Sequence, residues 1–168
     1  MSIPAPGDSA APAPAVMRRV LGRFASGVVV VSGTGSSGPV GFTCQSFFSL
    51  SLDPPLVALA PSRSSASWPH LHRSELFSAN VLADGQEQLA RGFSRSGVDK
   101  FADVEWWPGP NGTPHIAGAL AWVDCRVEEV HPGGDHHLVV GRVLDLAGGD
   151  GLPLVFFRGG FSGIAGSP

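Results

Sequence analysis

Charged residues are scarce in this sequence, and neither sign dominates. They make up 15% of the 168 residues, and the formal net charge is -3. A protein that binds nucleic acid or an anionic membrane needs a basic field to attract phosphate groups. We therefore expect no nucleic-acid partner and no membrane partner. A surface with so few charges also favours an oligomer that covers part of it.

Cysteines are few, and long apolar runs are missing. Cys44 and Cys125 lie far apart and form no CxxC spacing. No stretch approaches the roughly 18 uninterrupted apolar residues of a membrane helix. The first residues also lack the basic and apolar regions of a signal peptide. Two thiols without an export signal are typical of a reducing compartment, so we expect a soluble, cytoplasmic protein.

Several familiar binding and catalytic motifs are absent. The Rossmann nucleotide fingerprint is missing, because the GxGxxG match at residues 33–38 (GTGSSG) leads into another predicted strand and not into a helix. Neither a GxSxG elbow nor a Cys/His pairing is visible, so hydrolytic chemistry is disfavoured. His70-x-His72 and His136-His137 offer imidazoles, but no carboxylate or thiolate joins them at a recognised ligand spacing. We expect no metal site.

The residues that are plentiful predict a mainly β fold. Hydrophobic residues make up 43% of the chain, and 23 glycines and 15 prolines separate valine-rich runs without a period. This pattern favours short strands joined by tight turns, with roughly six to eight strands and two or three inserted helices. An antiparallel barrel is favoured over a doubly wound sheet. We expect a flexible Pro/Ala-rich lead over residues 1–15 and one domain over 16–168.

The local patterns predict individual elements. Apolar residues spaced at i, i+4 and i+8 from Val16 predict an amphipathic helix that ends near Ser26-Gly27. Trp68-Pro69 opens a second helix with Ser67 as N-cap, and Asp84 to Glu87 matches a capping box before a third. A long polar loop covers 94–114. The predicted strands are 28–32 (buried on both faces or central), 40–49, 56–60, 77–82, 119–130, 136–146 and 154–158.

Alternation within 119–130 separates two faces of that strand. Cys125 shares one face with Ala119, Ala121 and Val123, and is expected to be a small core residue rather than a nucleophile. The opposite face carries charged side chains, which are Asp124, Arg126 and Glu128.

The segment Gly41–Pro55, GFTCQSFFSLSLDPP, combines small polar groups with apolar ones. Thr43, Gln45 and Ser46 place hydroxyl and amide groups beside phenylalanines. One interpretation is a ligand that lies against the sheet. The other is a half-buried antiparallel strand whose polar face is in water. This segment alone leaves both open.

A second polar segment is Pro61–Leu71, PSRSSASWPHL. Four serines surround Arg63 just before the predicted helix start. Hydroxyls, backbone N–H groups and one guanidinium can together cradle a phosphate group. An ordinary serine-capped turn explains the same residues.

Six segments in this order resemble the flavin reductase-like family with the FMN-binding split-barrel fold. The resemblance covers roughly residues 16–163, and the segments are GFTCQSFFSLSLDPP, PSRSSASWPHL, FSANVLA, DKF, GALAWVDCRV and GDHHLVVGRV. It implies a homodimeric NAD(P)H:flavin oxidoreductase that reduces FAD or FMN. The implied partner is a flavin-dependent monooxygenase that receives the reduced flavin.

The resemblance also implies cofactor-binding residues. Those expected along the isoalloxazine ring are Thr43, Cys44, Gln45 and Ser46. Those expected around the phosphate are Ser62, Arg63, Ser64 and Ser67. Residues near the flavin from the inserted helix and loop are Phe93, Ser94 and Lys100. His136 is expected over the nicotinamide, with Phe161 close to it.

Three of these positions depart from the family pattern. Gln45 stands where Asn is frequent and Ser67 where Thr is frequent, and both keep hydrogen-bonding ability. Phe161 replaces a frequent Tyr and so lacks its hydroxyl. No catalytic side chain is expected, because hydride transfer between two cofactors needs alignment rather than a nucleophile. The alternative is a non-catalytic flavin-binding protein on the same scaffold.

Overall fold

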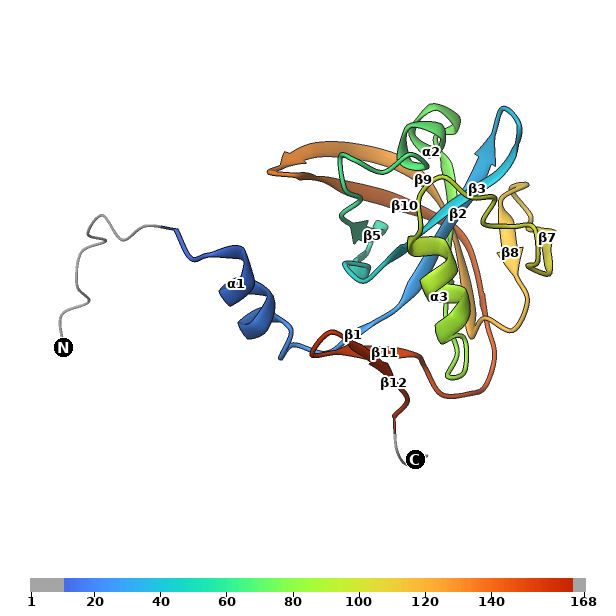
Figure 1. Ribbon diagram of the computed structural model, residues 1–168. Helices are drawn as coiled ribbons and strands as arrows, with labels where there is room; N and C mark the ends of the chain where they lie inside the picture. The colour runs from blue at the N-terminus through green and yellow to red at the C-terminus, as the bar shows by residue number, and fades with distance from the viewer. Residues whose placement is uncertain (1–10, 165–168) are drawn as a thin grey trace.

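The alternating and valine-rich segments form a seven-stranded antiparallel sheet (Figure 1). The computed structural model describes residues 11–164. The strand order in this sheet is β3-β2-β6-β9-β10-β5-β4. The strands are β2 (Val29–Gly35), β3 (Gly38–Cys44), β4 (Phe48–Leu52), β5 (Pro55–Leu59), β6 (Leu76–Val81), β9 (Ala121–Gly133) and β10 (His136–Gly148).

Two small sheets and three helices complete the described part of the chain. One sheet joins β1 (Ser26–Gly27), β11 (Val155–Phe157) and β12 (Gly160–Ser162), and the other joins β7 (Trp106–Pro108) and β8 (Pro114–Ile116). The helices are α1 (Pro14–Leu21), α2 (Trp68–Ser74) and α3 (Glu87–Ser94). None of the helices within 11–164 is long and apolar enough to span a bilayer. The predicted mainly β fold with inserted helices is confirmed.

The core occupies both faces of the sheet, and β2 contributes to each. Val29 and Val31 point into one apolar cluster, which also receives Trp68 and Leu71 from α2. Val28 and Val30 belong to the second cluster, which lies under α3. Successive strand side chains point to opposite faces, so a continuous apolar run suits a strand covered on both sides. The prediction for 28–32 is confirmed.

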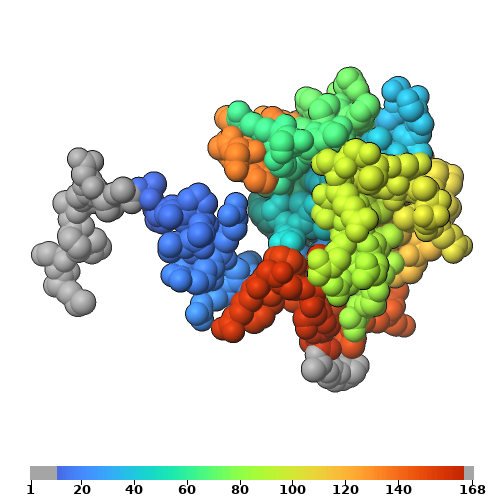
Figure 2. All heavy atoms as spheres, in the orientation of Figure 1, coloured from blue at the N-terminus to red at the C-terminus, as the bar shows by residue number. Residues whose placement is uncertain are grey.

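The first helix is shorter than predicted and stands away from the sheet (Figures 1 and 2). The helix ends at Leu21, and the Gly22 N–H donates to the Arg18 carbonyl. It does not continue to Ser26–Gly27, because these two residues pair with β11. No residue of α1 is buried. The predicted boundary between residues 15 and 16 falls inside this helix, and residues 1–10 of the predicted lead lie outside the described residues.

The predicted strand 40–49 is two strands, β3 and β4, with a break at 45–47. At the break, a side chain replaces the backbone ladder. The Ser46 hydroxyl accepts a hydrogen bond from the Ala60 N–H at 2.8 Å and donates to the Ala60 carbonyl at 3.4 Å. The chain can therefore turn from one edge of the sheet to the other without losing these two bonds.

Ser67 is the N-cap of α2 as predicted, but neither predicted cap forms its side-chain capping bond. Ser67 makes no capping bond, and the Trp68 N–H donates to the Ser65 hydroxyl instead. At α3 the N-cap is Gln86, whose side-chain oxygen accepts from the Ala83 N–H at 2.9 Å. Asp84 accepts only from the neighbouring Gly85 N–H, so the capping box does not form.

Candidate functional site

A cavity of about 980 Å³ opens beside β3. Its volume suits a cofactor-sized ligand, since such sites measure roughly 300–1,000 Å³. Five segments and His70 of α2 surround it; the segments are 39–46 around β3, the serine-rich loop 60–67, the C-terminal half of α3, the loop 96–101, and the turn between β9 and β10. The two polar segments singled out in the sequence therefore form one site, which favours the ligand interpretation for both.

Gly41 allows α3 to pack closely on β3. A Cβ at this position would lie 2.9 Å from the Val31 carbonyl oxygen and 3.0 Å from the Phe93 ring. The Thr43 hydroxyl then fastens the helix by donating to the Ala90 carbonyl at 2.5 Å. The wall between β3 and α3 is thus fixed by one close approach and one hydrogen bond.

The Gly41 carbonyl joins three of the surrounding segments. It accepts hydrogen bonds from the Ser67 hydroxyl at 2.7 Å and from the Lys100 ammonium at 3.0 Å. Partial burial lowers the pKa of Lys100 below its ordinary value. A cation held this way adds positive charge to a wall made mainly of hydroxyl and backbone groups, and it favours an anionic ligand.

Cys44 is a neutral thiol in this wall. Burial raises its pKa, and the hydrogen bond with Ser46, whose oxygen lies 3.2 Å from the sulfur, opposes the rise only in part. A protonated, buried thiol is neither a nucleophile nor a metal ligand at neutral pH. Cys44 can contact a ligand, but it supplies no redox or covalent chemistry.

His136 is placed at the cavity by bonds between β10 and the serine-rich loop. It forms an isolated β-bridge with Ser62, while the Arg63 N–H donates to the Asp135 carbonyl at 3.0 Å. The His136 Nδ1 lies 2.7 Å from an Asp135 carboxylate oxygen, and this hydrogen bond is the main cause that lowers the pKa of Asp135. Its imidazole is thereby oriented at the mouth of the cavity.

Most of the residues predicted to bind cofactors line this cavity. These are Thr43, Cys44, Gln45, Ser46, Ser62, Ser64, Ser67, Phe93, Ser94, Lys100 and His136. Arg63 is exposed and does not line it, although its two sequence neighbours do. Phe161 lies apart on β12, where it packs against Phe156 at 5.2 Å and under the Arg91 guanidinium at 5.0 Å.

Sequence reasoning missed several lining residues. Five of them belong to the loop after α3, whose length was a sign of function but whose members gave no individual signal. The missed residues include Ser65, His70, Ser96, Gly97, Val98, Asp99 and Phe101.

The site offers polar and apolar contacts but no reactive side chain with a base beside it. Within residues 11–164, no three His, Cys, Asp or Glu side chains gather closely enough to hold a metal ion. Such a site is suited to binding molecules that carry their own reactive groups.

Comparison with known proteins identifies the family. A family model described as "Flavin reductase like domain" matches residues 21–165. The chain belongs to this family. The resemblance found in the six sequence segments is therefore confirmed.

Named members of the flavin reductase family are similar over most of the chain. The reductase subunit HsaB of a flavin-dependent monooxygenase from Rhodococcus jostii is 44% identical, over 94% of this chain and 84% of its own. The FMN reductase (NADH) SmoA from Agrobacterium fabrum is 43% identical, over 86% and 82%. The protein in a solved structure, the Streptomyces globisporus NADH:FAD oxidoreductase SgcE6 in complex with NAD and FAD fragments, is 36% identical. It superposes with a TM-score of 0.87 over 95% of this chain and 98% of that one.

Proposed function

We propose that this chain is an NAD(P)H:flavin oxidoreductase that reduces FAD or FMN. The observation that carries the proposal is the cavity beside β3, in a chain of the flavin reductase family. Its wall combines hydroxyls, a thiol, one amide, one ammonium, two imidazoles and one carboxylate with apolar rings. The hydrogen bonds of the lining hydroxyls and the thiol join them to each other or to backbone groups and not to a lining histidine or carboxylate. Relatives named for NADH, FMN and FAD support the same chemistry.

The residues present fit a flavin. The lining segment Thr43–Ser46 would hold the ring system, with the Phe93 side chain closing the apolar side. The phosphate group would lie along the serine-rich loop, and the residues proposed for it are Ser62, Arg63, Ser64 and Ser67. Ser94 and Lys100 would contact the flavin from the α3 side. A role for Phe161 beside the nicotinamide stays a prediction from the resemblance, since that ring lies outside the wall.

Hydride transfer itself is supplied by the bound nicotinamide and flavin. The protein contributes orientation, because reaction requires the two molecules to lie at near-attack distance. His136, oriented by Asp135 at the cavity mouth, is placed to orient the nicotinamide. Lys100 and the backbone donors of β3 add positive potential where an electron-rich ligand would bind.

We further propose that the reduced flavin passes to a separate flavin-dependent monooxygenase. Relatives named as reductase subunits of such enzymes support this partner. The nicotinamide requirement and the two free, buried thiols favour the cytoplasm.

A homodimer is the proposed assembly. Large apolar side chains are exposed on α1, on the edge strand β4 and on the far part of β10, with Leu21 62% exposed, Leu52 89% and Leu146 66%. Exposed apolar surface spread over three elements is typical of a protein interface.

Anaerobic mixing with NADH or NADPH and either flavin tests the function. We expect the visible absorption band of oxidised flavin to disappear at catalytic enzyme concentration. Flavin that binds but stays oxidised with both nicotinamides would instead support the non-catalytic flavin-binding protein.

A further inference from the structure

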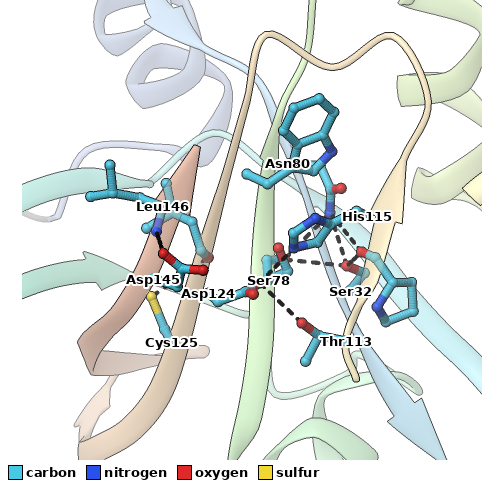
Figure 3. A network of polar contacts seen from close by, with 12 residues as sticks. Ser32, Ser78, Asn80, Thr113, His115, Asp124, Cys125, Asp145 and Leu146 are labelled. Atoms are coloured by element: carbon cyan, nitrogen blue, oxygen red, sulfur yellow. Dashed lines mark hydrogen bonds and ion pairs between the residues drawn. The ribbon is translucent and has the colours of Figure 1, made fainter. Parts of the chain in front are cut away.

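The β7–β8 hairpin is attached to the main sheet by side chains rather than by a backbone ladder (Figure 3). The Ser32 hydroxyl of β2 donates to the Pro114 carbonyl at 2.6 Å. The Ile116 N–H donates to the Asn80 side-chain oxygen of β6 at 2.7 Å. Both Ser32 and Asn80 are fully buried. Strand β8 is therefore seated on the sheet by buried polar side chains.

Asp124 of β9 extends this attachment. Its Oδ1 accepts hydrogen bonds from the Thr113 hydroxyl at 3.0 Å and faces the His115 Nε2 at 2.8 Å (Figure 3). Asp124 is 1% exposed and His115 7%. The sequence places Asp124 on the charged face of its strand, and the hairpin buries Asp124 while Arg126 and Glu128 of that face stay exposed. A buried carboxylate has to be compensated by such partners.

The His115 ring is also held in place by aromatic neighbours. It stacks on Trp122 with centroids 5.7 Å apart and an interplanar angle of 15°. Trp107 of β7 meets it edge-on at 6.3 Å. Gly109 leaves the space that the imidazole occupies, since a Cβ there would lie 2.2 Å from His115 Nε2.

A row of aromatic rings connects the hairpin to the cavity. Trp106 of β7 packs edge-on against Phe101 at 5.9 Å, and Phe101 packs edge-on against Phe93 at 4.9 Å. Phe93, Phe101 and the loop residues 96–100 between them line the cavity. This wall therefore has two attachments, α3 on one side and the hairpin on the other.

We propose that His115 and Asp124 are positioning residues for the flavin site, a role that rests on the proposed function. By fixing the hairpin, they hold the Trp106–Phe101–Phe93 row and the 96–101 wall at the distance that the flavin requires. His136 lies at the turn between β9 and β10 and is tied to the serine-rich loop. Loosening the hairpin should therefore weaken flavin binding and leave nicotinamide binding and the hydride step unchanged.

Steady-state kinetics of three variants test this role. His115→Ala removes the bond to Asp124, and Gly109→Ala displaces the imidazole while keeping every polar atom. Both should raise the KM for flavin about tenfold, with kcat and the KM for NADH within about twofold. His115→Gln, whose amide can still donate to Asp124, should restore most of the flavin affinity. It also keeps the test usable if His115→Ala fails to fold.

A matched control separates positioning from general destabilisation. Val57→Ala leaves a void in the core cluster that contains Val29 and Val31, and it should lower the melting temperature without changing the KM for flavin. Variants of His115 and Gly109 that lose stability like Val57→Ala but keep the wild-type KM for flavin would overturn the proposal.

Hydrogen–deuterium exchange of the flavin-free protein tests the positioning role of His115 and Asp124 without relying on enzyme activity. Residues 95–105 should exchange faster in His115→Ala than in wild type or Val57→Ala. Unchanged exchange there would overturn the proposal even if the wild type reduces flavin. A wild type that reduces no flavin would remove the proposed function, while this exchange comparison would still decide whether the pair holds the wall.

Discussion

At the scale of single residues, the cavity is built from side chains whose partners are mostly other protein groups. Thr43 and Ser67 were predicted as flavin contacts from their polarity and the resemblance. In the structure their hydroxyls bond to the Ala90 and Gly41 carbonyls. Each therefore also shapes the wall that a flavin would meet.

His136→Ala should separate nicotinamide binding from flavin binding. We expect the KM for NADH to rise about tenfold, equivalent to roughly 1.4 kcal/mol of lost binding, because the cavity mouth loses its oriented imidazole. The dissociation constant for flavin should change by less than about twofold. Steady-state kinetics and flavin fluorescence titration measure the two quantities.

His137→Ala is the matched control, since neighbouring strand residues point to opposite faces and His137 packs near Trp68. An equal loss of flavin and NADH affinity in His136→Ala would contradict the assignment of His136 to the nicotinamide.

Arg63→Ala should weaken FMN and FAD binding more than riboflavin binding. Arg63 is exposed between Ser62 and Ser64, which both line the cavity, so only a ligand that extends to this loop would meet its guanidinium. Removal of one phosphate contact should cost roughly 1–3 kcal/mol. Titration with the three flavins measures it, and equal losses would exclude Arg63 from the phosphate site.

Cys125 should make the protein less stable at high pH. Burial, and then the Asp124 charge, raises its pKa from 9.0 to about 12. The unfolded thiol loses its proton above pH 9 while the folded one keeps it. The free energy of unfolding should therefore fall between pH 9 and 12, by at most about 1.4 kcal/mol per pH unit. Urea unfolding should show a smaller fall in Cys125→Ala; equal slopes would contradict this.

At the scale of elements, the contact between β3 and α3 depends on a missing side chain. Gly41→Ala should lower the free energy of unfolding by about 1–3 kcal/mol, because its methyl group would meet the Val31 carbonyl and the Phe93 ring. It should also weaken flavin binding, since Phe93 lines the cavity.

Urea unfolding measures the Gly41→Ala effect. Gly27→Ala is the control, because a Cβ there meets nothing within 4 Å. Similar unfolding free energies for the two variants would show that the close approach is unimportant.

The elements themselves were largely predictable, and the failures have a common cause. Periodicity and turn residues located the buried strand 28–32 and the helix at Trp68, because burial imposes those patterns locally. The break at 45–47 and the burial of Asp124 depend on Ala60 and on the hairpin at 113–115. Such long-range partners leave no periodic trace in the sequence, so neither feature could be predicted.

At the scale of the whole molecule, α1 and its exposed apolar side chains bear on assembly. Val20→Asp combined with Leu21→Asp should shift a dimer toward monomer, since charges at a buried interface are costly. Light scattering after size exclusion measures the mass. Arg19→Ala on the same helix should leave the dimer intact, and a wild type that is monomeric at high concentration would contradict the proposed assembly.

The central claim is that this cavity brings a nicotinamide and a flavin together for hydride transfer. Anaerobic stopped-flow mixing of the protein with NADH and excess FAD or FMN tests it most directly. We predict repeated turnovers, with many flavin molecules losing their visible absorption per protein chain and slower NADH-dependent turnover in His136→Ala at low NADH. Flavin that stays oxidised with both NADH and NADPH, despite binding in the cavity, would contradict the account.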